Sequence, residues 1–506
     1  MPGPIAYDWL VDSQTNRRAN PDRPSPGDVT ALAVAVPDLG GLLSGWADVG
    51  HGTLPRRLAH ALRRAIQSGV LPTGWRLPPE RQLAESLAVS RTTISEALDE
   101  LRGEGLLRST QGRGTFVSSP VQAAPVGTRV ADHLSVGRGV DLATGNPPDL
   151  SHLPNVEIDM SLLTASGGGP GVYVMGLPAM AEAVADLYRR GGFTGPPRRT
   201  DADEIHITSG AHQAMSLLIA ALVGRDRPLA LAQLNYPGIF DILDGQGLRA
   251  APVGIDSAGM LPESLEQVIV EQRPAALYVQ VGPHNPTGKV LPPARVRALA
   301  EIVDRYDVAV IEDNTLAALT FPGVSRPETF LDACRSAPVV SIGSLSKVCW
   351  AGLRLGWIRA PQPLIEQTMY RRLSIDLGAS APSQLIALSL LPHLDDIAAE
   401  RRRRLVEAVE YGHALLSEAM PEAVIGRPEG GSVLWTELPI ADSGPFVSLA
   451  RRHGVHVAPG SICVTGRLPG PYLRICVDRP LDLLREGADR LARAWRDARP
   501  SPLVAG

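Results

Sequence analysis

The chain has 506 residues, of which 44% are hydrophobic, and a formal net charge of −4 at pH 7. This length predicts two or three domains, and the composition predicts a globular protein with a sizeable core. No run approaches the ~18 apolar residues of a membrane span, the N-terminus lacks the pattern of a secretory signal, and the four cysteines show neither paired nor metal-site spacing. We therefore expect a cytoplasmic protein without a metal site.

Charge is distributed unevenly along the chain. Residues 51–118 contain ten arginines and six acidic residues, a net charge of +4, so the remainder carries −8. A small basic module joined to an acidic body is the asymmetry expected of a DNA-binding domain attached to an effector-binding domain. Residues 1–50 are rich in Pro, Gly and Asp and predict a partly disordered extension, in which the apolar run from Leu32 to Leu43 is compatible with a short helix.

Residues 51–118 have the pattern of three helices followed by a hairpin. Leucine or isoleucine at every fourth position predicts a first helix over residues 53–70, and two prolines open a second helix from Glu80 to Leu87. Ser90 can cap a third helix that is ended by Gly103. Residues 106–117 predict two short strands around a glycine-arginine-glycine turn, a wing.

This order of elements is typical of DNA recognition, in which the third helix enters the major groove and a wing arginine follows the backbone or minor groove. On charge and pattern alone, a small helical module with a solvated arginine face is the alternative. The segments 81–98 and 112–117 closely resemble the GntR-type winged helix-turn-helix, and the similarity covers about residues 53–117. The resemblance implies DNA contacts from Arg81, Ser90, Arg91, Thr92, Thr93, Gly112 and Arg113. Ser95 stands where the family often has arginine, which leaves the operator preference open.

Residues 119–139 combine small residues with two prolines and weak periodicity, which predicts a semi-rigid linker. From residue 140 to 506, short apolar runs alternate with amphipathic helices, the pattern of an α/β fold with a mostly parallel sheet. Ligands bind beyond the carboxyl ends of the strands in such sheets, so the polar turns after the strands form the candidate site. The clearest strand candidates are Glu204–Thr208, Leu229–Gln233, Ala276–Gln280, Val308–Glu312 and Val339–Ile342.

Lysine is nearly absent from the chain. Of the 49 basic residues, 47 are arginines and two are lysines, Lys289 and Lys347. Lys347 follows a strand candidate, with Ser344 and Ser346 beside it and Arg354 seven residues later. A lysine amine can lose its proton and form a Schiff base, whereas an arginine cannot, and an arginine fork suits a phosphate. When Lys347 is considered alone, an ordinary surface lysine in a chain that otherwise uses arginine is an equally good interpretation.

Other turns carry further candidates. Ser209, Gly210 and Ala211 open a helix that runs to Leu222, and exposed N–H groups at a helix start can seat a phosphate, although such a turn is usually only a cap. Tyr236 could stack on an aromatic ring, although buried tyrosines commonly belong to the core.

Three polar side chains complete the set of candidates. Asn285 can donate to a phenolic oxygen. The carboxylate of Asp313, in a dry site, would hold a pyridine nitrogen protonated. Arg474 could bind a substrate carboxylate through a two-point fork. Taken singly, each has a more ordinary structural explanation.

The order and spacing of these residues, with Lys347 placed 34 positions after Asp313, resemble the class I aminotransferase group of fold-type-I pyridoxal-phosphate enzymes over about residues 140–500. The resemblance implies a Schiff base between the cofactor and Lys347 and a carboxylate contact from Arg474. The cofactor contacts that it implies come from Ser209, Gly210, Ala211, Tyr236, Asn285, Asp313, Thr315, Ser344, Ser346, Lys347 and Arg354.

A GntR-type domain joined to an aminotransferase-like body is the layout of the MocR-type transcription regulators. The resemblance implies a homodimer with a head-to-tail, domain-swapped arrangement and a cofactor site near the dimer interface. Two departures stand out. Thr315 lies where the pattern expects a tyrosine that donates to the phenolic oxygen of the cofactor, and the segment around Tyr173 is shorter than its counterpart. Both favour a binding site over a fast transaminase, because turnover needs tight geometry around the freed lysine.

We therefore expect a transcription regulator that binds a double-stranded DNA operator and senses pyridoxal phosphate or an amino compound. One alternative is a pyridoxal-phosphate-dependent aminotransferase with a vestigial winged helix, and the missing tyrosine weighs against it. The other is a DNA-binding protein that uses its body only to dimerise, and the joint presence of Asn285, Asp313, Lys347 and Arg354 weighs against that.

Overall fold

A computed structural model describes most of the chain, as two compact units, Met1–Val126 and Gly127–Gly506. The residues that it describes are 46, 53–67, 71, 76–103, 106–110, 114–117, 129–130, 139–146, 148–165, 171–191, 195–325 and 328–498. Apart from Trp46, the predicted N-terminal extension and its apolar run lie outside these residues. Among the described helices, none is long and apolar enough to cross a membrane.

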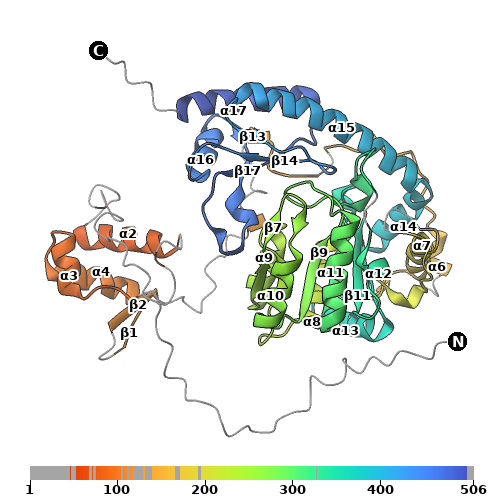
Figure 1. The fold of residues 1–506 in the computed structure, drawn as a ribbon, viewed down its shortest axis with the longest axis horizontal. Coiled ribbons are helices and arrows are strands. Elements are labelled where there is room, and N and C mark those ends of the chain that lie inside the picture. Colours follow the sequence, from red (N-terminus) through yellow and green to blue (C-terminus); the bar gives the residue numbers. More distant parts are fainter. Residues whose placement is uncertain are drawn as a thin grey trace, which may run out of the picture. The chain divides into compact units, whose positions relative to one another are not determined.

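The first unit, here called the head, has the predicted three helices and hairpin (Figure 1). Its apolar core joins the helices to the end of the hairpin and includes Leu58, Leu62, Ile94, Leu98 and Val117. The two strands pair antiparallel, with Leu107 opposite Val117. The elements are α2 (Leu54–Gln67), α3 (Glu80–Ser86), α4 (Arg91–Gly103), β1 (Leu107–Thr110) and β2 (Gly114–Val117).

The second unit, here called the body, is built on a mixed, mostly parallel sheet of seven strands, as the alternation of strands and helices predicts. One strand, β12, runs antiparallel to both of its neighbours, and the other neighbouring pairs are parallel. In spatial order the strands are β4 (Ile205–Thr208), β12 (Gly356–Arg359), β11 (Val339–Ser344), β10 (Ala309–Asp313), β9 (Ala276–Gln280), β5 (Leu229–Ala232) and β6 (Ala250–Val253).

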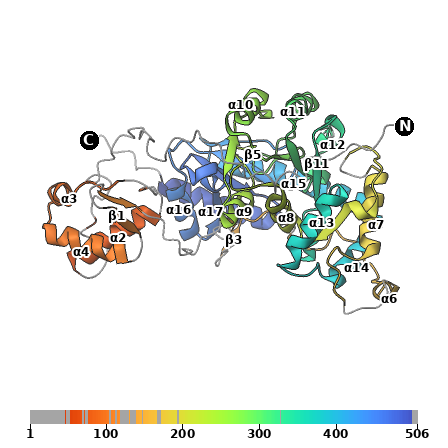
Figure 2. The ribbon, with the colours of Figure 1, turned by 90° about the horizontal axis from the view of Figure 1, so that it is seen from below.

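Helices cover both faces of this sheet (Figure 2). On β9, Tyr278 packs into the apolar cluster of one face, while Leu277 and Val279 pack into the cluster of the other. A sheet that is buried on both faces explains why its strands are nearly continuous apolar runs in the sequence. The helices of one face are α8 (Ala211–Leu222), α9 (Pro237–Gln246) and α13 (Gln362–Leu373), and those of the other are α10 (Pro262–Gln272), α11 (Pro293–Tyr306) and α12 (Phe330–Ala333).

The C-terminal part of the body forms a smaller layer, in which helices α15 and α17 lie along a four-stranded antiparallel sheet (Figure 1). The segment that follows the predicted linker enters this layer, because β3 pairs with β15. Its elements are β3 (Val140–Asp141), α15 (Leu394–Ala419), β13 (Val424–Ile425), β14 (Val433–Glu437), α16 (Gly444–Arg452), β15 (Val455–His456), β16 (Ala458–Pro459), β17 (Tyr472–Cys476) and α17 (Leu481–Ala498).

The remaining elements connect these layers. They are the helices α6 (Ser161–Ala165), α7 (Pro178–Arg189) and α14 (Ala381–Leu390), the hairpin of β7 (Ile255–Asp256) and β8 (Gly259–Met260), and the short 3₁₀ turns η3 (Ala202–Glu204), η4 (Ala317–Leu319), η5 (Ala351–Leu353), η6 (Leu391–His393), η7 (Gly460–Cys463) and η8 (Thr465–Arg467).

Candidate functional site

The start of α4 in the head presents a polar surface that Ser90 organises. The Ser90 hydroxyl accepts a hydrogen bond from the Thr93 backbone N–H at 3.1 Å and lies 2.8 Å from the Thr93 hydroxyl. Ser90 therefore caps the N-terminus of α4, and the Thr93 side chain contacts this cap. The opposite face, which includes Ile94, is buried in the head core. Arg91 and Thr92 are exposed, so these two side chains of the first turn are available to a partner.

The other predicted DNA contacts are less fully described. Arg81, at the start of α3, is exposed and pairs with Glu85 at 3.1 Å. A pair so open to solvent contributes little, so a phosphate can compete for the guanidinium. Ser95 is half-buried on α4. The predicted wing residues Gly112 and Arg113 lie outside the described residues.

The body contains a cavity of about 450 Å³ where its parallel strands end. Segments that follow β5, β9, β10 and β11 meet there, as expected of the ligand site of such a sheet. Ser209, Gly210 and Tyr173 are not among its lining residues. The predicted residues that do line it are Ala211, Tyr236, Asn285, Asp313, Thr315, Ser344, Ser346, Lys347, Arg354 and Arg474.

The amine of Lys347 is held at the cavity wall. Its Nζ donates hydrogen bonds to the Gly145 carbonyl and to Asn146 Oδ1, both at 2.7 Å. Part of the side chain is accessible from the cavity, but protein surrounds the amine. This burial, together with the positive charge of Arg474, lowers the pKa of Lys347 from 10.5 to about 8. A substantial neutral fraction at mildly alkaline pH suits a nucleophilic amine.

Asp313 is the most firmly held acid of the cavity. Its Oδ2 accepts hydrogen bonds from the Tyr278 hydroxyl at 2.6 Å and from Gln280 Nε2 at 3.3 Å, and its Oδ1 accepts one from the Thr315 N–H at 2.9 Å. Burial and the neighbouring carboxylate raise the pKa of Tyr278 well above its ordinary value, so the tyrosine stays a proton donor. These three contacts hold the Asp313 carboxylate in place in a site where the residue is only 5% exposed.

The turn before α8 contacts Arg354, at the end of the cavity where the phosphate of the cofactor is predicted to bind. Arg354 Nη2 donates to the Ser209 carbonyl at 3.0 Å. Gly210 has φ of +90°, and a Cβ there would come within 2.9 Å of the same guanidinium, so this position requires glycine. Ser344 shapes the neighbouring turn, since its hydroxyl donates to the Leu355 carbonyl at 3.0 Å.

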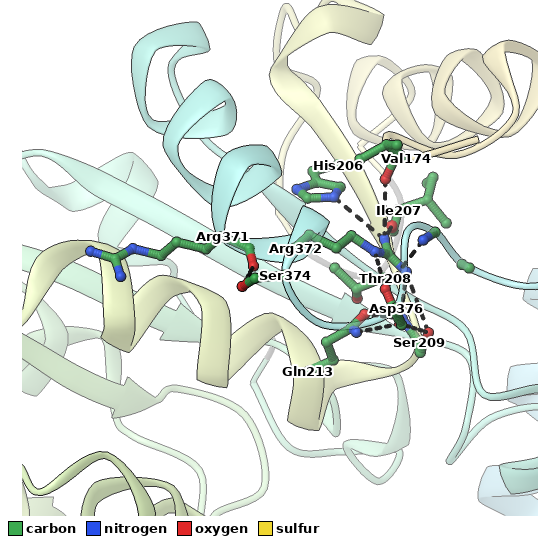
Figure 3. Close-up of polar contacts among 12 residues, drawn as sticks. Val174, His206, Ile207, Thr208, Ser209, Gln213, Arg371, Arg372, Ser374 and Asp376 are labelled. Carbon is green, nitrogen blue, oxygen red and sulfur yellow. Dashed lines mark hydrogen bonds and ion pairs between the residues drawn. The ribbon is translucent and has the colours of Figure 1, made fainter. Parts of the chain in front are cut away.

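A cluster of polar residues around Arg372 holds the turn before α8 in place (Figure 3). The buried guanidinium of Arg372 donates to the Ile207 carbonyl and pairs with Asp376 at 2.8 Å. The Asp376 carboxylate in turn accepts hydrogen bonds from the Ser209 hydroxyl at 3.2 Å and from Gln213 at 2.6 Å. Arg372 therefore fixes the end of β4 and, through Asp376, the first residue of the turn.

Two residues that line the cavity have buried hydroxyls to which no described residue is hydrogen-bonded. Ser346 Oγ and Thr315 Oγ1 have no hydrogen-bond partner among the residues that the structure describes. Both residues line the cavity. A buried hydroxyl without a partner is costly, so these two groups fit a site that is completed by a polar ligand. Tyr236 adds an aromatic wall, with its ring edge-on to His212 at a centroid distance of 6.4 Å.

Arg474 reaches the same cavity from β17. Its Nε donates to Asn285 Oδ1 at 3.1 Å and its Nη1 to the Ala143 carbonyl at 2.7 Å. No described residue accepts a hydrogen bond from its Nη2, which lies beside Gly145. The arginine is thus fixed in place, with donor capacity left for an anion.

The predicted linker also contributes to this cavity. Val130 lines it, and the backbone N–H groups of Arg129 and Val130 donate to the two carboxylate oxygens of Asp241 at 2.8 and 2.9 Å. Arg129 is 4% exposed, and its Nη1 donates to the carbonyls of Ile462 and Val464 at 3.0 and 2.6 Å. The linker is therefore anchored to the body within residues 119–139, directly at the cavity wall.

Several residues of the site were missed by reasoning from the sequence. Tyr278 and Gln280 lie two positions apart on a strand that was predicted, so their side chains share a face, and this spacing beside Asp313 is a signal that could have been used. Asn146, Asp241 and Arg129 had no comparable signal, because their partners are distant in the sequence. Among the described residues, no group of His, Cys, Asp and Glu could hold a metal ion.

Two family models match the chain. Residues 138–491 match the model for aminotransferase class I and II, and residues 54–117 match that for the gntR family of bacterial regulatory proteins. The uncharacterized HTH-type transcriptional regulator YdfD of Bacillus subtilis is 26% identical, over 83% of this chain and 91% of its own. The HTH-type transcriptional regulator TauR of Rhodobacter capsulatus is 29% identical, over 82% of this chain and 90% of its own.

Other similar proteins are aminotransferases. The 2-aminoadipate transaminase of Thermus thermophilus is 28% identical, over 66% of this chain and 90% of its own. An archaeal alanine:glyoxylate aminotransferase superimposes with a TM-score of 0.64 and 25% identity, over 74% of this chain and 96% of that structure. The kynurenine aminotransferase of Pyrococcus horikoshii, solved in complex with PMP, has a TM-score of 0.65 and 23% identity, over 75% and 96%. The body therefore has the fold of these aminotransferases.

Replacing Asp241 by alanine should release the linker from the cavity wall. Two backbone N–H groups would lose their acceptor, which costs about 1–3 kcal/mol and raises the local opening equilibrium by roughly ten- to a hundredfold. Hydrogen exchange of the peptide that contains Arg129 and Val130 would measure this. The exposed Asp226, elsewhere in the body, supplies the control variant Asp226→Ala, and equal protection of that peptide in both variants would contradict the anchor.

Proposed function

The chain belongs to the aminotransferase class I and II family and carries a GntR-type domain at residues 54–117, and from this premise we propose that it is a transcription regulator whose body binds pyridoxal phosphate through Lys347 and senses that cofactor or an amino compound. One observation carries the proposal. Lys347, Asp313 and Arg354 line one cavity together with Ser346 and Thr315, whose hydroxyls have no hydrogen-bond partner among the described residues. This set has a partner for each polar part of the cofactor.

The proposed roles follow from the chemistry of each group. When bound, the cofactor supplies an aldehyde that forms a Schiff base with an amine and a pyridine ring that accepts electrons. Asp313 would hold the ring nitrogen protonated, and the start of α8 with Arg354 would bind the phosphate. The resemblance assigns Ser344 to the phosphate as well, but its hydroxyl donates to the Leu355 carbonyl, so we propose that Ser346 takes this role. Tyr236 would cover the ring, Asn285 would donate to its phenolic oxygen, and Arg474 would bind a carboxylate of the effector. The shorter Thr315 side chain, in place of the tyrosine of the family pattern, favours sensing over rapid turnover.

An aminotransferase is the second candidate, and the position of Arg474 favours it. Its guanidinium faces the same cavity as Lys347, as a site for amino acids requires. Incubation with amino acids separates the two functions. Formation of pyridoxamine phosphate at about 1 s⁻¹ or faster would establish an ordinary enzyme, whereas a regulator needs no such rate.

A homodimer is part of the proposal. The end of α13 and the loop after it expose four large apolar side chains, Tyr370, Leu373, Ile375 and Leu377, at 43–68% of their surface. Such a concentration of exposed apolar surface is typical of a protein interface. Asp376 of the same loop contacts Ser209 at the phosphate end of the cavity. These observations support a partner subunit beside the cofactor site, and the head-to-tail, domain-swapped arrangement remains the form that we propose.

The anchored linker supports a route from the cavity to the head. Val130 lines the cavity and Arg129 joins α9 to the segment around Ile462, so a ligand that moves either wall changes the support of the linker. The ligand would then shift the population of head orientations according to its differential affinity for them. Footprints of the full-length dimer on a DNA duplex selected from a random library test this, with and without pyridoxal phosphate and a panel of amino acids. We expect the protected region or the affinity to change, and identical footprints in all conditions would contradict sensing.

Arg91→Ala should weaken binding to the selected duplex by about tenfold or more, because a side chain at the base edges contributes roughly 1–3 kcal/mol. Arg56→Ala on α2 removes the same charge from the exposed surface of the head and controls for the general electrostatic effect. Equal losses in the two variants, at several salt concentrations, would contradict a specific role for the start of α4. The measurement is fluorescence anisotropy of the labelled duplex.

The capture of pyridoxal phosphate should depend on pH through Lys347. The neutral amine is the reactive form, and its pKa of about 8 means that the capture rate rises about tenfold per pH unit below 8 and levels off above it. Stopped-flow absorbance of the Schiff base measures this rate. Arg474→Gln removes a nearby positive charge, so the plateau should move to higher pH. A rate in the unaltered protein that still climbs tenfold between about pH 8.5 and 9.5 would contradict the lowered pKa.

A further inference from the structure

The short segment that follows β3 brings two hydrogen-bond acceptors to the amine of Lys347. The Gly145 carbonyl and Asn146 Oδ1 each accept a hydrogen bond from Lys347 Nζ at 2.7 Å. Both residues line the same cavity as Lys347, and Asn146 is half-buried there. Neither acceptor is among the residues that the family resemblance assigns to the cofactor. The reactive atom of the cavity is thus held by a segment to which no role has been given.

The segment is itself fixed by Arg479. The Arg479 Nε donates to the Asp141 carbonyl at 2.7 Å, and its Nη2 donates to the Thr144 carbonyl at 2.6 Å. Its Nη1 also donates to the Asn146 carbonyl at 3.3 Å. The Asp141 carboxylate pairs with the same guanidinium at 2.9 Å and accepts hydrogen bonds from the N–H groups of Ala143 and Thr144 at 2.8 and 3.1 Å. The two acceptors are therefore presented to the amine in a defined position.

The number of acceptors matches the neutral form of the amine. A neutral lysine amine has two N–H groups and one lone pair, whereas the ammonium has three N–H groups and no lone pair. When one N–H is donated to Gly145 and the other to Asn146, the lone pair of the neutral amine remains free. In Schiff-base formation this lone pair forms the bond to the aldehyde carbon, and the aldehyde oxygen leaves as water with the two amine protons. The product nitrogen carries at most one proton, so at least one of the two hydrogen bonds is lost in the reaction.

The charged and titratable groups around the amine act on it in both directions. Burial and the positive charge of Arg474 lower the pKa of Lys347, and Arg354 adds to this effect. Cys476 and Asp478 act in the opposite direction. The two neutral acceptors bind an ammonium more strongly than a neutral amine, because a charged donor makes the stronger hydrogen bond. Removal of one acceptor should therefore lower the pKa of Lys347 further.

We propose that Asn146 is a positioning residue for Lys347, which together with the Gly145 carbonyl binds both N–H groups of the neutral amine and leaves its lone pair free to react. This role rests on the proposed function, because the amine meets an aldehyde in this cavity only if the cofactor binds. The contact between the two side chains does not rest on it and can be measured in the protein alone. Asn146 is also the acceptor that a substitution can remove, since Gly145 uses its backbone.

The chemical shift of lysine Cε against pH, in the full-length protein labelled with ¹³C-lysine, measures the protonation of Lys347. The chain has two lysines, so Lys289→Arg assigns the remaining signal. Asn146→Ala should lower the pKa of Lys347 by about 0.5–1, because the ammonium loses more than the amine does. Asn146→Asp should raise it by about 1 or more, because a carboxylate then contacts the ammonium. Asn155→Asp adds the same charge at an exposed position and should leave it unchanged.

The rate of pyridoxal phosphate capture tests the orientation of the amine. At a pH where Lys347 is neutral in every variant, Asn146→Ala should slow capture about tenfold, because its amine is free to turn. Asn146→Asp keeps an acceptor in the same place and should retain the rate. Displacement of the Lys347 pKa in the same direction by both variants, as a merely loosened site would produce, would overturn the proposal, and so would an unchanged rate in Asn146→Ala. Absence of capture by the unaltered protein, with the two opposite pKa displacements intact, would refute the proposed function and not the contact.

Discussion

The carboxylate of Asp313 is the group on which the rest of the body site depends. It lies at the last position of a central strand, where only 5% of the residue is exposed. Three hydrogen-bond donors compensate the cost of burying it there. Two of these donors, Tyr278 and Gln280, come from the neighbouring strand, so the register between β9 and β10 sets the geometry of the acid.

Much of this arrangement could be predicted from the sequence, for identifiable reasons. Apolar runs predicted five of the seven strands of the body sheet to within two residues, whereas β6 and β12 were not among the predicted strands. The parallel strands then required the turns after them to meet at one edge. Lys347 could be singled out because lysine is so rare in this chain. The three helices and the hairpin of the head follow from apolar spacing and from the Ser90 cap in the same way.

What could not be predicted depends on tertiary contacts between distant residues. Tyr278 lies in the predicted strand Ala276–Gln280, but its hydroxyl donates to an acid 35 positions later, which the strand pattern does not indicate. Arg129 was read as part of a linker because small residues and prolines surround it, whereas Asp241, 112 positions away, holds its backbone. Weak periodicity indicates that a segment does not form an amphipathic helix or strand. It does not indicate whether a single buried arginine anchors that segment to the body.

The most direct test of the central claim, that Lys347 carries the cofactor, is to titrate the full-length protein with pyridoxal phosphate, reduce it with borohydride and map the labelled peptide. The chain has only two lysines, and Lys289 is paired with Glu429, so the result is nearly binary. Stoichiometric label on Lys347, lost in Lys347→Ala and kept in Lys289→Ala, is the predicted result. No label, or label on Lys289 alone, would contradict the account and leave the body as a scaffold for the DNA-binding head.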